Sequence, residues 1–192
     1  PVWWSQDGGQ IWEPRSTGIT NTNPLCFAMD PNNPAVVYVG CERDGGPYGI
    51  YKTTNGGIQW NQCGNLVYTV RDIWINPNNS QILYIATDNS IWKSTNAGSD
   101  FVRLNPPSGE IIDAYCLTTN TSVSPNVLFT SFHDFNESIA RIYKTTNDGT
   151  NWTEVLAAGY YPSSLVIEKN TGGQIMYATF CLHQLYPVHG NS

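Results

Sequence analysis

The sequence is poor in charged residues. Asp, Glu, Lys and Arg make up only 12% of its 192 residues, against about 25% in an average soluble domain. Nine Lys and Arg are scattered singly among fifteen Asp and Glu, and the net charge is −6. A nucleic-acid-binding protein needs a basic patch, and so does a protein that binds anionic lipids. The composition therefore argues against both kinds of partner.

Long hydrophobic runs and helical periodicity are also missing. No apolar stretch approaches the roughly 18 residues of a membrane-spanning helix, so we expect no membrane insertion. No ten-residue stretch repeats its apolar positions with the period of a helix. The hydrophobic residues instead form short runs rich in β-branched and aromatic side chains, as at residues 36–40 and 82–86, and turn residues bound each run. The sequence predicts an all-β fold.

One pattern occurs four times. A hydroxyl residue is followed two positions later by Asp or Asn, after two more by Gly, and after a further three by an aromatic residue. The copies begin at residues 5, 53, 94 and 145, so the spacings are 48, 41 and 51 residues. A four-stranded propeller blade takes roughly 40–50 residues. The copies are Ser5, Asp7, Gly9 and Trp12; Thr53, Asn55, Gly57 and Trp60; Ser94, Asn96, Gly98 and Phe101; and Thr145, Asn147, Gly149 and Trp152.

Each part of the repeat has a role in folding. We name the strands of a blade A to D in chain order, and the repeat spans the turn between C and D. The Asp or Asn side chain can hydrogen-bond the turn backbone, Gly can adopt a positive φ, and the aromatic ring can pack on the blade. For the first complete blade we expect A at 25–30, B at 36–41, C at 49–53 and D at 58–62.

The repeats, together with the string of residues 30–60, resemble the Asp-box (BNR) family of β-propellers, and most of all its sortilin-type and xyloglucanase-type branch. That string reads Asp-Pro-Asn-Asn-Pro, then Tyr-Lys-Thr-Thr-Asn-Gly-Gly, then Trp60. The chain departs from the family pattern where Asn replaces Asp in three copies and Phe101 replaces Trp. The resemblance implies a propeller of four-stranded antiparallel blades. It also places the repeats at the periphery, away from the ligand face, so they are expected to be neither catalytic nor metal-binding.

The phase of the repeats predicts how the single propeller domain, residues 1–192, is divided. Residues 1–15 supply strands C and D of a split blade, residues 16–63, 64–104 and 105–156 form three complete blades, and residues 157–192 supply strands A and B of the split blade. Three arrangements stay open. The two halves pair within one chain, they pair between chains to give a ring or a filament, or the sequence is a fragment of a longer chain.

Five cysteines leave an odd thiol if the others pair. Cys26 on strand A and Cys41 on strand B are the expected disulfide, a staple across the hairpin. The alternative is that the cysteines are reduced and pack in the blade core. Cys63 and Cys181 lie near strand ends and are candidates for a bond between chains. No pair has the Cys-x-x-Cys spacing of a zinc or redox site.

Candidate catalytic groups come from the resemblance. The related sialidases need an arginine triad, and no arginine here has the Arg-Ile-Pro context of that family. Xyloglucanase-type relatives use two carboxylates as acid and base. Their cleft lies between two large propellers, which this chain is too short to supply. The candidates in this chain are Asp44 in a B–C loop, and Asp72 and Asp113 at the start of A strands near the central channel. Turn capping and solvation are the alternative roles. We expect no metal and no cofactor.

The predicted function is that of a non-catalytic extracellular module for binding or structure. Its expected partners are other copies of itself, another protein or carbohydrate. The alternative is a glycoside hydrolase, xyloglucanase-like rather than sialidase-like, or a fragment of one. The uncharged polar surface and four Asn-x-Ser/Thr sequons favour export and glycosylation. The sequons are at Asn78, Asn120, Asn136 and Asn151.

Overall fold

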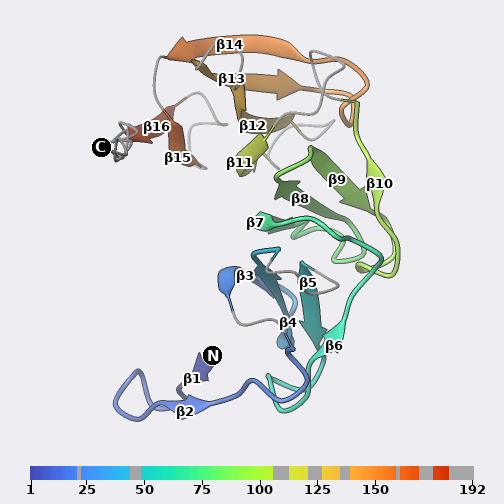
Figure 1. Ribbon diagram of the computed structural model, residues 1–192, viewed down its shortest axis with the longest axis vertical. Helices are drawn as coiled ribbons and strands as arrows, with labels where there is room; N and C mark the ends of the chain where they lie inside the picture. The colour runs from blue at the N-terminus through green and yellow to red at the C-terminus, as the bar shows by residue number, and fades with distance from the viewer. Residues whose placement is uncertain are drawn as a thin grey trace, which may run out of the picture.

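The computed structural model describes residues 1–20, 23–43, 49–105, 113–120, 127–134, 139–158, 161–168 and 175–181. Within these ranges the chain forms strands and turns only. Three antiparallel sheets have four strands each, and two hairpins have two strands each. The sheets follow one another along an open arc that begins at the hairpin of β1 and β2 and ends at the hairpin of β15 and β16 (Figure 1). The prediction of three complete four-stranded blades with a further blade divided between the ends is confirmed.

The first complete blade comprises β3 (Pro24–Asp30), β4 (Asn33–Cys41), β5 (Ile50–Thr53) and β6 (Asn61–Gln62). Strand D therefore begins at residue 61 and not at the predicted 58. The backbone N–H groups of residues 59 and 60 are bonded elsewhere than to strand C. Gln59 N donates to the Asn55 side chain within the turn, and Trp60 N donates to the Thr17 carbonyl outside it.

The other complete blades repeat this arrangement. The second comprises β7 (Val70–Ile75), β8 (Leu83–Thr87), β9 (Ile91–Ser94) and β10 (Val102–Arg103). The third comprises β11 (Asp113–Asn120), β12 (Val127–Asp134), β13 (Ile139–Thr145) and β14 (Thr153–Ala158). Each A strand carries an irregularity at its start, for example between Val70 and Asp72. Because the irregularity has the same place in each A strand, the residues of the A and B strands can be aligned position by position from blade to blade.

The split blade consists of two separate hairpins, β1 (Trp3–Trp4) with β2 (Glu13–Pro14), and β15 (Tyr161–Ile167) with β16 (Met176–Cys181). They belong to different sheets and lie at opposite ends of the arc (Figure 1). Pairing of the two halves within one chain is therefore not the arrangement of this structure.

The cores lie between neighbouring blades. One cluster joins the first blade to the second, with Tyr38 and Ile50 packing against Ile75 and Leu83. Another joins the second blade to the third through Tyr84 and Leu117 among others, and a further one joins the third blade to β15. Strand residues alternate between the two faces of a sheet, so each blade offers one face to the blade before it and one to the blade after it.

The expected disulfide between Cys26 and Cys41 is absent, because both thiols are free. Register explains the error: Cys26 lies opposite Gly40, whereas Cys41 lies opposite Pro24. Since opposed residues share a face and neighbours alternate, the two thiols point to different sides of the blade. Cys26 packs against the cluster shared with the second blade, and Cys41 belongs to the cluster formed with Val2 and Trp60.

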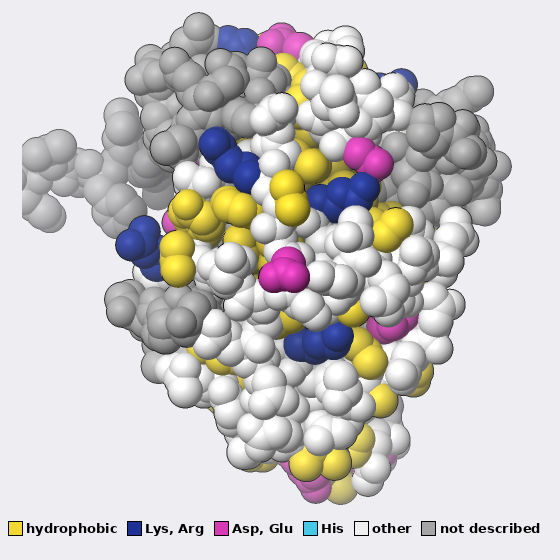
Figure 2. Space-filling view, turned by 90° about the vertical axis from the view of Figure 1, so that its right-hand side faces the viewer, with side chains coloured by type: hydrophobic (Ala, Val, Ile, Leu, Met, Phe, Trp, Pro, Cys, Tyr) yellow, Lys and Arg dark blue, Asp and Glu magenta, His cyan; other side chains and the backbone are white. Residues whose placement is uncertain are grey.

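Nothing in the described ranges is a helix long and apolar enough to cross a membrane. On the face drawn in Figure 2, basic and acidic side chains are scattered among hydrophobic side chains and other, uncharged atoms. This scatter matches the low and dispersed charge of the sequence.

Candidate functional site

The four repeated turns share one set of hydrogen bonds. In the first complete blade the Thr53 hydroxyl donates to Asn55 Oδ1 at 2.8 Å and accepts from Gly57 N at 3.0 Å. The same hydroxyl contacts recur in the other three turns. Two consecutive residues in each turn have positive φ, and these include Ala97 and Asp148 as well as glycines. The side chains of the repeat form the hydrogen bonds of the turn, so we assign them to folding and not to catalysis or ligand binding.

The aromatic residue of the repeat ties neighbouring blades together. Trp60 Nε1 donates to the Arg15 carbonyl at 2.8 Å, and Trp152 Nε1 donates to the Asn105 carbonyl at 2.7 Å. Phe101 has no donor, and its ring instead packs so close to Gly64 that a Cβ there would lie 2.7 Å from it. Trp12 bonds only within its own turn among the described residues and is 57% exposed.

A second group of polar side chains lies at the edge of the blades opposite the repeated turns, and these side chains take no part in the turns. A strands begin at this edge and B strands end there, as the pairs Val70 with Thr87 and Asp113 with His133 show. Neighbouring blades therefore bring the starts of β7, β11 and β15 together. We call the resulting cluster of Arg71, Asp113, Tyr115, His133 and Tyr161 the A-strand edge.

An ion pair between blades is the centre of the A-strand edge. Arg71 Nη2 lies 2.9 Å from Asp113 Oδ2, and the Arg71 guanidinium lies 4.4 Å from the centre of the Tyr115 ring. Burial raises the pKa of Asp113 above its ordinary value, although Arg71 acts in the other direction. The charge of the nearby Asp88 raises that pKa further. The edge thus combines a cation, a carboxyl group with a raised pKa and an aromatic ring.

Aromatic rings extend this edge to the last hairpin. Tyr115 meets Tyr161 edge-on with ring centres 6.2 Å apart. The His133 ring stacks on Tyr161 at 3.9 Å and is only 2% exposed. Sequence reasoning did not connect these residues, because they come from different blades and share no spacing.

The three carboxylates that the sequence offered as catalytic candidates differ in their surroundings. Asp113 lies in the A-strand edge. Asp72 accepts hydrogen bonds from Ile73 N at 2.9 Å and from Leu117 N at 2.8 Å, so it fastens β7 to β11. Burial raises the pKa of Asp72. Both of its oxygens are occupied by backbone donors, so we assign it to structure. Asp44 lies outside the described residues.

Other predicted sites are placed only in part. The sequon residues Asn78 and Asn151 are exposed. Asn136 lies outside the described residues, and Asn120 is the last residue of β11. Among the residues that the structure describes, no group of three or more His, Cys, Asp and Glu side chains is arranged to hold a metal ion.

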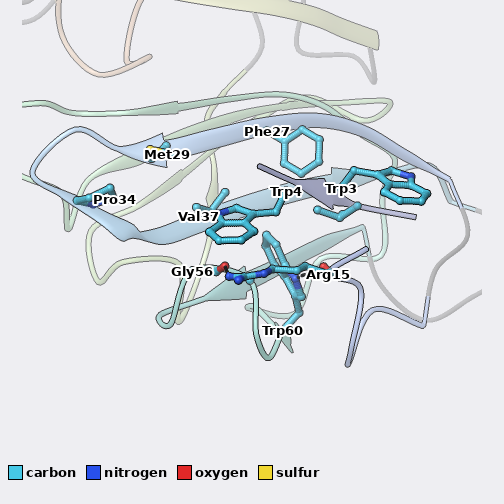
Figure 3. A pocket seen from close by; sticks show the side chains of 11 residues that line it. Trp3, Trp4, Arg15, Phe27, Met29, Pro34, Val37, Gly56 and Trp60 are labelled. Atoms are coloured by element: carbon cyan, nitrogen blue, oxygen red, sulfur yellow. Dashed lines mark hydrogen bonds between the residues drawn. The ribbon is translucent and has the colours of Figure 1, made fainter. Parts of the chain in front are cut away.

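A second candidate site is an apolar pocket of about 230 Å³ between the first hairpin and β3, which we call the β3 pocket. Arg15 stacks on the Trp4 ring at 3.3 Å, and its Nη1 donates to the Gly56 carbonyl at 2.7 Å. Figure 3 shows Phe27 and Met29 on β3 beside this stacked pair. The pocket has one charged group and several large apolar ones, which suits a flat or aromatic occupant.

Comparisons with known proteins agree with the fold. No family model matches the chain. A xyloglucanase of Hypocrea jecorina (strain QM6a) is 24% identical over 196 residues, which is 93% of this chain and 23% of that protein. The crystal structure of an ancestral GH74 enzyme matches 88% of this chain and 23% of that one, with a TM-score of 0.68 and 20% identity.

The GH74 xyloglucanase from Xanthomonas campestris matches 94% of this chain and 33% of that structure, with a TM-score of 0.69 and 15% identity. The chain thus spans about a quarter of the length of the first two relatives. At these identities the likeness shows the fold alone: the chain is a β-propeller. Membership of the Asp-box family stays a prediction.

Proposed function

We propose that this chain is part of a xyloglucanase-type glycoside hydrolase, and that its A-strand edge binds a β-glucan chain. The observation that carries the proposal is the ion pair of Arg71 and Asp113 beside the Tyr115 ring, on a fold shared with xyloglucanases. This reading favours the glycoside hydrolase alternative over a purely non-catalytic module.

The chemistry of the edge suits a sugar. A pyranose ring presents C–H groups on its faces, which pack on aromatic rings, and hydroxyl groups around its rim, which need hydrogen-bond partners. Tyr115 and Tyr161 supply rings, and Arg71 and Asp113 supply a donor and an acceptor at one edge. Because three blades contribute, the edge forms an extended surface, as a polymeric ligand requires.

Asp113 is the carboxyl group of this chain best suited to a catalytic role. A glycosidase needs a carboxylic acid that is still protonated when it meets the substrate, and burial raises the pKa of Asp113. Asp88 is close enough to influence that pKa and is a candidate for the second carboxylate. Hydrolysis itself is proposed for the longer enzyme, since the chain spans only part of its relatives.

Calorimetric titration with a xyloglucan oligosaccharide tests binding. We expect Tyr115→Ala to weaken binding about tenfold, which is the loss of roughly 1.4 kcal/mol. Trp12→Ala is the matched control, because Trp12 is exposed on the opposite edge, and it should bind like the parent. A chain that binds no β-glucan, or a Tyr115→Ala variant that binds unchanged, contradicts the proposal. Release of reducing sugar that disappears in Asp113→Asn would add hydrolysis.

Export from the cell is part of the proposal. The exposed positions of Asn78 and Asn151 support it, because a glycosylated sequon must be accessible. Expression through a eukaryotic secretory pathway, followed by enzymatic removal of N-glycans, should lower the mass if either site is used. An unchanged mass would speak against glycosylation of the chain.

A further inference from the structure

Two lysines of the complete blades occupy equivalent positions. Lys52 precedes the repeated turn of the first complete blade, and Lys93 precedes that of the second. Each lies opposite a tyrosine of strand B, Tyr38 for Lys52 and Tyr84 for Lys93. Each ammonium group also lies over the ring of that tyrosine, at 5.2 Å and 5.5 Å from the ring centre. Both lysines therefore face the following blade in the same way, and in both cases that blade is complete.

The two lysines differ in what they meet on the following blade. Lys93 Nζ lies 3.0 Å from Asp148 Oδ2, so a carboxylate neutralises its charge. The residue equivalent to Asp148 is Ala97, and both have a φ of 55°. Because alanine has no carboxylate, Lys52 Nζ donates to the Ala97 carbonyl instead, at 2.9 Å. Among the described residues Lys52 has no ion pair.

Lys52 also has hydrogen-bonding capacity to spare. An ammonium group has three N–H donors, and within the described part of the chain one acceptor is found, the Ala97 carbonyl. The Lys52 side chain is half-buried, so water screens its charge less than that of a fully exposed lysine. The ammonium group can therefore donate to a bound anion without giving up its bond to Ala97.

A pocket of about 310 Å³ opens beside this lysine, and we call it the Lys52 pocket. It lies between strands β5 and β6 of the first complete blade and the turn that joins β9 to β10 in the second. None of the described residues that line it is Asp or Glu. Its other polar side chains are uncharged, and they are Thr54, Asn61, Gln62 and Ser99. The Lys52 pocket thus combines one positive charge with hydroxyl and amide groups.

Two carboxylates on the turn side of these blades are engaged elsewhere. Asp100 Oδ2 accepts a hydrogen bond from Asn96 Nδ2 at 3.0 Å. Asp30 Oδ1 accepts one from Ser80 Oγ at 2.6 Å. Neither carboxylate lines the Lys52 pocket, so the charge of Lys52 is available to a ligand.

We propose that the Lys52 pocket binds a sugar acid, a uronate, whose carboxylate pairs with Lys52 as that of Asp148 pairs with Lys93. Hydrogen bonds between an ammonium group and a carboxylate are about twice as strong as neutral ones. The hydroxyl and amide groups of the pocket suit the hydroxyl groups of a sugar ring. The pocket lies on the turn side of the blades, opposite the A-strand edge, and a β-glucan has no carboxylate. The two sites are therefore independent.

Titration of the isotope-labelled chain with sodium glucuronate, followed by NMR at constant ionic strength, tests the site. The backbone amide signals of Gly64, Gly98 and Ser99, which line the pocket, should shift and saturate. Glucose, which has no charge, should leave these signals unchanged at the same concentrations. Lys52→Gln removes the charge and should raise the dissociation constant of glucuronate about tenfold.

Ala97→Asp is the decisive variant. It supplies a carboxylate beside Lys52, at a positive φ that aspartate adopts more readily than alanine does. The variant should be at least as stable to heat as the parent, so a loss of binding would not come from unfolding. Its own carboxylate should compete with glucuronate and raise the dissociation constant at least about tenfold. Lys93→Gln is the matched control, because Lys93 is already paired, and it should bind glucuronate like the parent.

Three results would overturn the proposal. In the first, glucuronate shifts none of the signals from the Lys52 pocket of the parent chain. In the second, a folded Ala97→Asp variant binds glucuronate as the parent does. In the third, inorganic phosphate binds at the same signals as tightly as glucuronate, which would show that the pocket recognises charge and not a sugar acid. Each result leaves binding of β-glucan at the A-strand edge untouched, because that binding is measured separately.

Discussion

The hydroxyl of Tyr38 donates a hydrogen bond of 2.9 Å to the backbone carbonyl of Ala97, and the two residues belong to neighbouring blades. Strand B of one blade is thereby fastened to the repeated turn of the next. One blade further on, the Tyr84 hydroxyl donates to the side-chain carboxylate of Asp148, which occupies the position of Ala97 in its own turn. The repeat thus serves two purposes, since it closes its own turn and receives a donor from the preceding blade.

Tyr38→Phe tests the contribution of this bond to stability. The substitution keeps the buried ring and removes the hydroxyl, and Ala97 retains its bond from Lys52. We expect the free energy of unfolding to fall by about 1 kcal/mol, measured by urea titration. Tyr68→Phe is the control, because the Tyr68 hydroxyl has no hydrogen-bond partner among the described residues. Equal losses in the two variants would show that the bond contributes nothing.

Thr53→Val tests the turn itself. The Thr53 side chain is buried, and replacing its hydroxyl removes the acceptor of the buried Gly57 N–H. An unsatisfied buried donor costs about 1–3 kcal/mol, so urea unfolding should show a loss of that size. Ser5→Ala in the first turn should cost less, because Gly9 is exposed and water can replace the lost acceptor. Thr54→Val, at an exposed neighbour, should be close to neutral.

The elements were predictable from the sequence because local chemistry determines them. Short apolar runs gave the strands, and the turn residues gave the blade period and the division of the split blade. Contacts between blades were not predictable in the same way. The Arg71–Asp113 pair joins β7 to β11, and its geometry depends on how two sheets twist against each other. The irregularity between Pro24 and Cys26 likewise decides which side of the blade Cys26 faces, and nothing in the sequence marks it.

The described cysteines should be slow to alkylate in the folded chain. Burial raises the pKa of Cys26 to about 12 and the pKa of Cys41, Cys63 and Cys116 to about 11. Since the thiolate is the reactive form, iodoacetamide at pH 8 should label these four only after denaturation, as peptide mass mapping can show. Rapid labelling in the folded state, or a peptide linking Cys26 to Cys41, would contradict the structure.

Asp72 and Asp7 should influence stability with opposite dependence on pH. Burial raises the pKa of Asp72 above its ordinary 3.8, so its protonated form favours folding. That contribution is complete below pH 3.8 and is lost as pH rises through the raised pKa. Hydrogen bonds from the Ile11 backbone and the Ser5 hydroxyl lower the pKa of Asp7. Its contribution is present above pH 3.8 and is lost as pH falls through the lowered value.

Urea unfolding of the parent chain, Asp72→Asn and Asp7→Asn between pH 3 and 7 separates the two cases. As pH rises, the parent should lose stability relative to Asp72→Asn and gain stability relative to Asp7→Asn, because neither asparagine titrates. Each difference reports one carboxyl group, since the other titrating groups are common to both members of the pair. Differences that change in the same direction would show that burial does not dominate the ionisation of Asp72. Its two bonds from Ile73 N and Leu117 N would then outweigh the cost of burying its charge.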